Sequence, residues 1–186
     1  MAYILKTSLR ILILFSCFLP LHAQKEDLIQ TSLQSKWLES GQSLDDIAHY
    51  KIIDLYTDDN TNITYAYLQQ YYLDIPIENA IANFAIKNNE VVVGNVDRWV
   101  GNLSQKIKFN SNSLTASDAV VQSLARSGIQ QYLRSKPVVK TEFNQHHLVF
   151  SKTEKVREDI PAQLVYKIQQ DGNLVLTWKV GIHRCV

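Results

Sequence analysis

The chain has 186 residues, of which 46% are hydrophobic, and its 19 basic and 18 acidic side chains give a formal charge of +1. This size suits one globular domain or two small subdomains that share a core. The charge is near neutral, so the chain lacks the large excess of basic residues that is typical of proteins that bind nucleic acids or anionic membranes.

Residues 1–23 have the organisation of an export signal. Lys6 and Arg10 precede the apolar run Ile11 to Leu21, and Leu21-His22-Ala23 is a suitable cleavage site. The run is shorter than the roughly 20 residues that a spanning helix needs. We therefore predict a cleaved signal peptide and a secreted or periplasmic protein without stable membrane insertion. An uncleaved anchor and a lipoprotein signal with the lipobox Leu14-Phe15-Ser16-Cys17 are the alternatives.

Cleavage at this site changes the cysteine count. Cys17 leaves with the signal, and Cys185 remains alone. No intrachain disulfide is then expected, so stability has to come from the packed core.

A helix and a strand are predicted next. Apolar residues spaced for one helical face predict a helix over about 28–40, with Gly41 as its left-handed C-cap: Leu28, Ile29, Leu33, Trp37 and Leu38. Tyr50 to Tyr56 then has the composition of a strand, and Asp58 to Asn62 has that of a turn.

The following segment reads Tyr65-Ala66-Tyr67-Leu68-Gln69-Gln70-Tyr71-Tyr72-Leu73-Asp74-Ile75-Pro76-Ile77-Glu78-Asn79-Ala80. It predicts an alternating strand, a turn marked by proline, and a second alternating strand that carries Ala82, Phe84 and Ile86 on one face. A two-residue turn at Asn88-Asn89 would pair Ile86 with Val91 and Phe84 with Val93.

These residues resemble the fungalysin/thermolysin propeptide (FTP) domain. That family typically shows a strand ending in glutamine, a Gly-Ile-Pro-Val-like turn, an Asn-Ala strand, and a turn before a Val-Val run. Asp74 stands where the family turn usually has glycine. The resemblance covers about residues 40–182 and is strongest over 63–95. It implies a removable companion of a secreted zinc metallopeptidase and not an enzyme.

Residues 101–114 are polar and predict a connector, after which a second helix begins. Thr115 can cap it by accepting the N–H of Asp118, and Gly128 ends it. Its apolar stripe is Ala116, Val120, Val121, Leu124 and Ala125. The Leu-Thr-Ala-x-x-Ala-like entry into this helix resembles the PepSY-like half of such propeptides.

A C-terminal hairpin is predicted from two apolar rows, one with Leu164, Tyr166 and Ile168 and one running from Leu174 to Ile182. A three-residue loop, Asp171-Gly172-Asn173, keeps both rows on one face, with Asn173 in the left-handed position. It pairs Ile168 with Leu176, Tyr166 with Trp178, and Leu164 with Val180. The strand from Leu174 to Val180 resembles one near the end of fungalysin-type propeptides.

Catalytic motifs are missing from the sequence. It contains no His-Glu-x-x-His zinc motif, no Gly-x-Ser-x-Gly elbow and no glycine-rich phosphate loop. His146 and His147 are adjacent, so on a strand they would point to opposite faces, and His49 and His183 stand alone. We therefore predict no catalytic, cofactor-binding or metal-binding residues, and no cofactor.

Three further features have an ordinary explanation. Asp58-Asp59 lacks the spaced carboxylates of a calcium loop and is predicted to be a solvated turn. Asn62-Ile63-Thr64 and Asn102-Leu103-Ser104 match the glycosylation sequon, a pattern that is common by chance. The tyrosines at 65, 67, 71 and 72 either form a binding surface or, as is more common, pack across a sheet.

The sequence as a whole predicts an α+β protein of antiparallel sheets with two main helices. The expected organisation is a signal peptide (1–23), an FTP-like subdomain (24–100), a connector (101–114) and a PepSY-like subdomain (115–186) that is truncated at its C-terminus. The resemblance implies a propeptide that assists folding of a fungalysin-like zinc metallopeptidase and inhibits it until cleaved, with the mature catalytic domain as partner. The alternatives are a free-standing exported binding or inhibitor protein, and the N-terminal fragment of a metallopeptidase.

Overall fold

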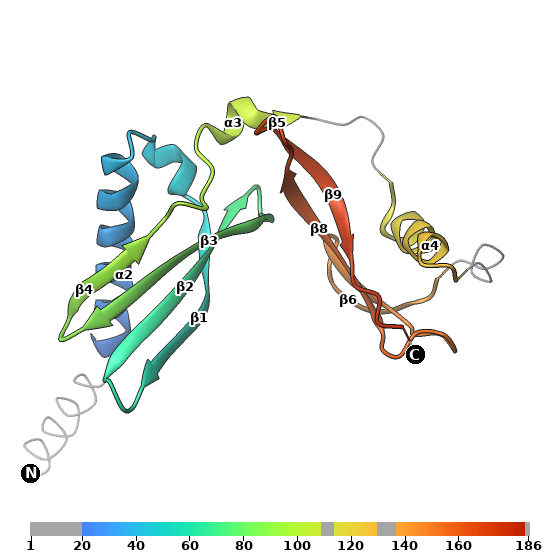
Figure 1. The fold of residues 1–186 in the computed structure, drawn as a ribbon, viewed down its shortest axis with the longest axis horizontal. Coiled ribbons are helices and arrows are strands. Elements are labelled where there is room, and N and C mark those ends of the chain that lie inside the picture. Colours follow the sequence, from blue (N-terminus) through green and yellow to red (C-terminus); the bar gives the residue numbers. More distant parts are fainter. Residues whose placement is uncertain (1–19, 109–113, 130–136, 185–186) are drawn as a thin grey trace, which may run out of the picture. The chain divides into compact units, whose positions relative to one another are not determined.

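The structure is a computed structural model that describes residues 20–108, 114–129 and 137–184 (Figure 1). Its fold is α+β, as predicted. The chain divides into two compact units: unit 1 comprises residues 1–68 and 81–99, and unit 2 comprises residues 69–80 and 100–186. Most of the predicted signal peptide and both cysteines lie outside the described residues. The described helices contain no stretch that is both long and apolar enough to cross a bilayer.

Unit 1 begins with helix α2, Pro20–Glu39, which lies against the sheet of this unit (Figure 1). The helix starts earlier than predicted, because proline is tolerated in the first turn and no residue between Leu21 and Asp27 breaks a helix. Its buried face consists of Ile29, Leu33 and Trp37, spaced four residues apart. Leu38 was predicted on this face but is 53% exposed.

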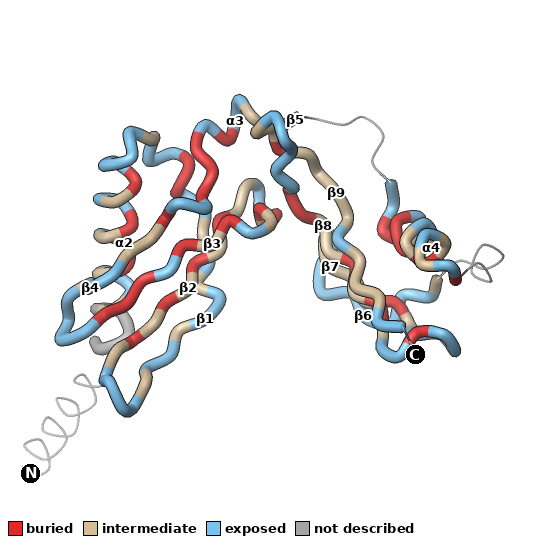
Figure 2. The backbone as a smooth tube through the Cα atoms, in the orientation of Figure 1, coloured by how far each residue is buried: buried red, intermediate tan, exposed pale blue. Residues whose placement is uncertain are grey.

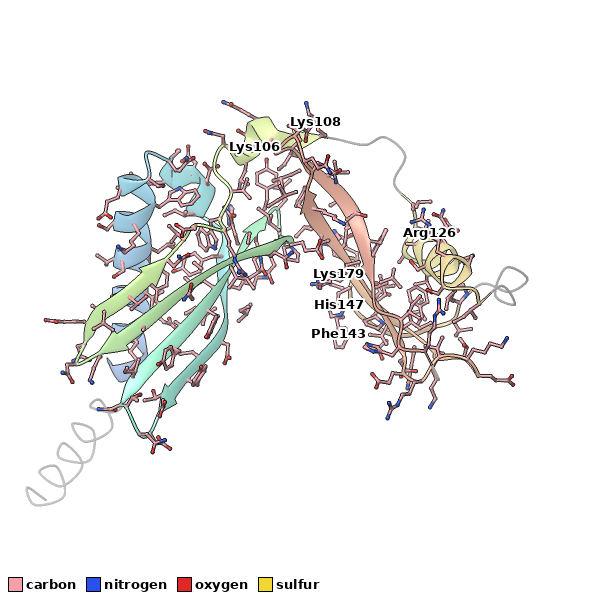
Figure 3. All side chains as sticks on the ribbon, in the orientation of Figure 1. Lys106, Lys108, Arg126, Phe143, His147 and Lys179 are labelled. Carbon is pink, nitrogen blue, oxygen red and sulfur yellow. The ribbon has the colours of Figure 1, made fainter. Side chains whose placement is uncertain are left out.

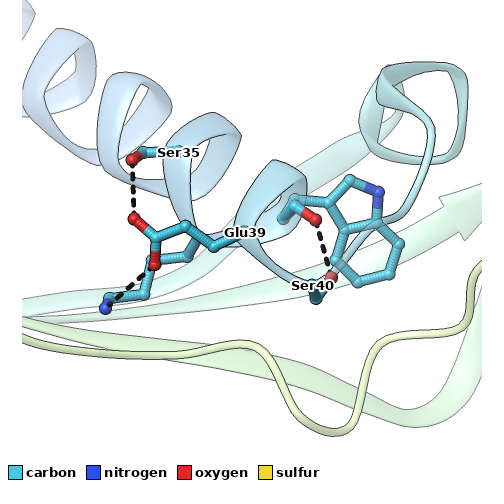
Figure 4. Close-up of polar contacts among 5 residues, drawn as sticks. Ser35, Glu39 and Ser40 are labelled. Carbon is cyan, nitrogen blue, oxygen red and sulfur yellow. Dashed lines mark hydrogen bonds and ion pairs between the residues drawn. The ribbon is translucent and has the colours of Figure 1, made fainter.

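The C-terminus of α2 has the predicted glycine cap. Gly41 has φ +75°, its N–H donates to the carbonyl of Leu38 (2.9 Å), and the N–H of Gln42 donates to that of Trp37 (3.4 Å). This pair of bonds is a Schellman motif. Figure 4 shows the surrounding polar contacts, in which Ser35 donates to Glu39 (3.1 Å) and Ser40 donates to the carbonyl of Trp37 (2.6 Å).

The sheet of unit 1 is built from β1 (Tyr50–Asp58), β2 (Ile63–Tyr72), β3 (Ile75–Lys87) and β4 (Glu90–Asn95). A short 3₁₀ helix, η1 (Leu44–Ile47), precedes β1 and is capped by Ser43; it was not predicted from the sequence. Burial alternates along β2, with Ala66 and Leu68 fully buried, and Figure 2 shows buried stretches on both α2 and β3. The core of unit 1 therefore lies between the helix and one face of the sheet.

The β3–β4 hairpin has the predicted turn but a different register beyond it. Asn88 and Asn89 have φ +52° and +61°, and Ile86 pairs with Val91 as expected. A bulge then shifts the ladder, so Phe84 pairs with Gly94 and not with Val93. The buried Phe84 ring occupies the space above Gly94, where a Cβ would lie 2.8 Å from its Cε1 atom. Aromatic packing against a glycine thus accompanies the shift.

The second segment of unit 2 begins at residue 100, next to the segment predicted as a polar connector (101–114), and there the structure differs. Helix α3 (Leu103–Lys106) and strand β5 (Ile107–Lys108) occupy this segment, and Leu103 and Ile107 are buried. Strand β5 pairs in parallel with β9 through Ile107 and Leu174. Within this polar segment the two buried apolar residues, Leu103 and Ile107, accompany its pairing with the sheet of unit 2.

Helix α4 (Ala116–Arg126) forms as predicted. Thr115 accepts the N–H of Asp118 (3.1 Å), and Gly128 has φ +77°. Ala116, Val120 and Leu124 are buried. They pack with Ile129, Phe150, Val156, Ile160 and Ala162 in the core of unit 2.

The sheet of unit 2 runs β6 (Val139–Asn144), β7 (His147–Phe150), β8 (Ile160–Ile168), β9 (Leu174–Val180), each antiparallel to the next. Strand β6 pairs with β7 at the end of this order, and all of its residues are exposed. In addition, Ile77 of β3 pairs in parallel with Tyr166 of β8.

The β8–β9 hairpin keeps the predicted faces but not the predicted register. Ile168 pairs with Leu174, Tyr166 with Leu176, and Leu164 with Trp178. The N–H of Gln169 donates to the carbonyl of Asn173 (2.8 Å), so the loop is Gln170 to Gly172. Gly172, with φ +78°, takes the left-handed position that was assigned to Asn173, because that conformation costs glycine less. The resulting shift of two residues leaves every side chain on its expected face.

Candidate functional site

The segment from Gln69 to Ala80 forms the tip of the β2–β3 hairpin and belongs to unit 2. Its turn is Leu73-Asp74, with φ +48° and +61°. Positive φ at both central residues is characteristic of a tight two-residue hairpin turn. Pro76 was predicted to mark the turn, but it lies inside β3. The aspartate at the position of the family glycine therefore does not loosen the turn.

Gln69 stabilises an irregular backbone at this tip. Asn79 has φ +63° within β3. The side-chain amide of Gln69 donates to the carbonyls of Ile77 (2.7 Å) and Ala80 (3.0 Å), on either side of Asn79. Asparagine accepts the left-handed conformation more readily than most residues. The two amide side chains, Gln69 and Asn79, together account for the irregularity.

Gln70 binds the start of the next segment of unit 2. Its side chain is fully buried, its Nε2 donates to the carbonyl of Val100 (2.9 Å), and its Oε1 accepts the N–H of Val100 (2.9 Å). Both polar groups of one buried peptide are thus satisfied by one side chain, as burial requires. The glutamine at this end of the strand is a structural residue.

Side chains of the tip also contact β8 and β9. The rings of Tyr72 and Tyr166 meet edge to face with centroids 5.9 Å apart, and Lys179 forms an ion pair with Glu78 (3.2 Å). Burial raises the pKa of Tyr166, and the nearby Tyr72 raises it further. Burial likewise raises the pKa of Tyr71, with a smaller effect of the Asp74 charge. The tip is therefore held in one conformation by several contacts.

The face of β2 opposite Ala66 and Leu68 carries tyrosines. The ring of Tyr56 lies 5.4 Å from that of Tyr65 and 6.4 Å from that of Tyr67. A hydrogen bond with Tyr67 is the main factor that raises the pKa of Tyr56. A cavity of about 330 Å³ adjoins this row and is lined by Tyr67, Ile81, Asn83, Asn95 and Arg98.

A groove of about 340 Å³ lies in unit 2 between α4 and the β8–β9 hairpin. Its lining includes Arg126, Leu164, Leu176 and Trp178, and Figure 3 shows Arg126 on α4. The indole N–H of Trp178 donates to the carbonyl of Leu114 (2.8 Å). Trp178 was predicted to face Tyr166, but it pairs with Leu164 and packs beside the α4 core.

The described residues include no cluster that could act as a metal centre. His146 lies in the turn between β6 and β7, not on a strand as assumed, and His147 contacts the ring of Phe143 at 4.8 Å (Figure 3). The main-chain carbonyl of His183 accepts the N–H of Arg157. Within residues 20–108, 114–129 and 137–184, no group of three or more His, Cys, Asp or Glu residues could hold a metal ion.

The remaining predicted features have local roles. The carboxylate of Asp58 accepts the N–H groups of Asn60 (2.8 Å) and Thr61 (3.4 Å), which is the contact that closes a turn. The sequon asparagines Asn62 and Asn102 both have positive φ, 54° and 58°.

Comparison with known families finds a match over part of the chain. Residues 48–94 match the family model described as Fungalysin/Thermolysin Propeptide Motif. The match runs from the residue after η1 to Gly94 in β4 and includes the whole β2–β3 hairpin. The chain therefore carries an FTP motif, as the resemblance predicted, and this motif is a propeptide domain, not a catalytic one. A search of curated proteins finds no match to the chain.

The motif also indicates a setting. FTP propeptides belong to secreted proteases of the fungalysin/thermolysin type, and the family implies association with a protease catalytic domain. Sequence reasoning identified the hairpin but missed what its glutamines bind. The signal that could have shown this is the pair Gln69-Gln70 on an otherwise tyrosine-rich strand. Adjacent residues of a strand point to opposite faces, so on a strand with one packed face one of the two amides has to be buried.

Proposed function

We propose that this chain is the propeptide region of a secreted fungalysin-like zinc metallopeptidase, which assists folding of the catalytic domain and inhibits it until cleaved off. The observation that carries the proposal is the FTP match over residues 48–94. The signal peptide (1–23) and the PepSY-like assignment of residues 115–186 are parts of the same proposal, supported by the sequence patterns described above.

An exposed edge strand among the described residues supports a role in binding a partner. Edge strand β6 exposes Val139 (45%) and Phe143 (64%), and Val138 beside it is 68% exposed. An exposed edge can pair with an extended segment of a partner through main-chain hydrogen bonds. A folded scaffold with such an edge can block a cleft without a reactive group of its own.

The test is a titration of a mature fungalysin-like peptidase from the same source with the purified chain. We expect peptide hydrolysis to fall as the chain is added, while the chain itself stays largely uncleaved. A parallel refolding of denatured peptidase should recover more activity in the presence of the chain. Unchanged hydrolysis at tens of micromolar of folded chain, with unchanged refolding yield, would refute the proposal.

Deletion of Gly101 to Leu114 is not a suitable probe of the inhibitory contact. Ile107 in this segment pairs with Leu174, and Leu103 is buried, so the deletion would damage unit 2 itself. Removal of the residues after Ile182 is a smaller change, although it also removes the bridge between Val156 and Arg184. A tail deletion that weakens inhibition without lowering the denaturation midpoint would place part of the contact there.

A free-standing exported binding protein is the second candidate. The observation that favours it is the tyrosine row of Tyr56, Tyr65 and Tyr67 beside the cavity with Arg98. Partly exposed aromatic rings next to an exposed arginine suit a ligand with both flat and anionic parts. Full inhibition of the peptidase by a Tyr67→Ala/Arg98→Ala variant would separate the two functions.

A further inference from the structure

The turn at the tip of the β2–β3 hairpin contains a residue that its backbone conformation disfavours. Seven non-glycine residues among those described have positive φ, and six of them are asparagine or aspartate: Asn62, Asp74, Asn79, Asn88, Asn89 and Asn102. The seventh is Leu73, with φ +48°. Leucine has no side-chain group that stabilises this conformation locally, so its presence here costs folding free energy.

Packing within the chain does not explain this leucine. Its exposed fraction is 62%, one of the largest among the described apolar side chains. A single exposed leucine is ordinary on a protein surface. A leucine that is exposed and also occupies a left-handed turn position is unusual, because asparagine or glycine suits that backbone conformation better.

The equivalent turn in the same sheet provides the comparison. Strands β3 and β4 are joined by Asn88-Asn89, with φ +52° and +61°, and this turn has the residues that its geometry prefers. Leu73-Asp74 has the same pair of positive φ values with a different first residue. The difference lies in the side chain that is presented to solvent.

The tip that carries Leu73 is also held by several side-chain contacts. Gln69 fixes the backbone around Asn79, Tyr72 packs on Tyr166, and Glu78 pairs with Lys179. An anchor carried by a backbone that is already held in position loses less conformational entropy when a partner covers it. These contacts are what a preorganised anchor requires.

We propose that Leu73 is a docking anchor that inserts into an apolar recess on the peptidase catalytic domain. The proposal rests on the proposed function and names the part of the chain that makes the contact. A few residues that fill pockets at the centre of a protein interface carry a large share of its binding free energy. Binding of this kind also explains why the turn keeps a residue that its backbone disfavours.

The decisive variant is Leu73→Asn, which suits the turn and removes the apolar side chain. We expect its denaturation midpoint to be equal to or higher than that of the wild type. Its inhibition of the mature fungalysin-like peptidase should be weaker by roughly 10- to 100-fold, the loss expected when one leucine side chain is no longer buried. Leu73→Met should retain most of the inhibition. Leu38→Asn is the matched control, since Leu38 is 53% exposed on α2, and it should inhibit like the wild type.

The possible outcomes distinguish the Leu73 anchor from the proposed function of the chain. Inhibition by the wild type and equally by Leu73→Asn overturns the anchor and leaves the proposed function standing. Absence of inhibition by the wild type overturns the anchor and, together with an unchanged refolding yield, the proposed function. A lower midpoint for Leu73→Asn assigns Leu73 a role in folding and overturns the anchor. A self-associated state that Leu73→Asn disrupts, with inhibition unchanged, assigns the tip to contact between copies of this chain and also overturns it.

Discussion

At the scale of single residues, the amide side chains of the hairpin tip explain why the motif has the residues it has. Gln70 satisfies both polar groups of the Val100 peptide, and Gln69 bonds to carbonyls on both sides of Asn79. An apolar residue at either position could fill the space but could not form these bonds. The glutamines therefore stabilise the backbone of the tip around Asn79 and at its contact with Val100.

Replacement of Gln70 by leucine tests this role. The N–H and carbonyl of Val100, a residue that is 7% exposed, would lose their partners. We expect a loss of about 2–6 kcal/mol in the free energy of unfolding, since two buried polar groups are left unpaired and each costs roughly 1–3 kcal/mol. Chemical denaturation measures it, with the exposed Gln122→Leu on α4 as the control. A loss below about 0.5 kcal/mol, the usual range for surface substitutions, would contradict the role.

At the scale of elements, the β8–β9 hairpin shows how a turn residue sets the register. Gly172 takes the left-handed position, and this places Trp178 opposite Leu164 beside the α4 core. Trp178 is half-buried, and its indole N–H bonds to the carbonyl of Leu114. Helix α4 and the hairpin are therefore linked by one aromatic side chain.

Trp178→Ala should destabilise the protein by about 3 kcal/mol, the lower end of the range for large aromatic deletions, because the side chain is only half-buried. Of a typical total of about 5–15 kcal/mol, this is a substantial share. The shift in denaturation midpoint measures it. Ile168→Ala, on the same hairpin but 41% exposed, should cost much less. Equal effects of the two substitutions would show that Trp178 contributes no more than a surface residue.

At the scale of the whole molecule, the chain combines two compact units with a propeptide motif and offers surfaces for interaction. The surfaces already described are the β6 edge, the tyrosine row and the hairpin tip with Leu73. Each of the three exposes apolar or aromatic side chains. This is consistent with a domain whose role is to bind a catalytic domain.

The purified chain should therefore show no peptidase activity and should bind no stoichiometric zinc. Tight zinc binding needs three or four ligands at a defined spacing, and the sequence lacks the His-Glu-x-x-His pattern. Metal analysis after dialysis, together with a peptide hydrolysis assay, measures both. About one retained zinc per chain would show that ligands are brought together in a way the sequence does not indicate.

The sequence by itself determined the local features of this protein. Helix caps at Gly41, Thr115 and Gly128 and the Asn88-Asn89 turn follow from residues a few positions apart, whose conformational preferences act within the element. The faces of the strands were likewise predictable, since alternation depends only on the period of two residues along a strand. The FTP resemblance rested on the same local patterns.

Only the tertiary structure decided features that depend on distant residues. The bulge that pairs Phe84 with Gly94, the attachment of Ile107 to Leu174 and the bonds between Gln70 and Val100 each join segments separated along the chain. A shift of register by two residues keeps every side chain on its face, so the pattern of hydrophobic residues cannot distinguish such registers. The choice among them depends on packing volume and on satisfaction of buried polar groups, and these are properties of the assembled core.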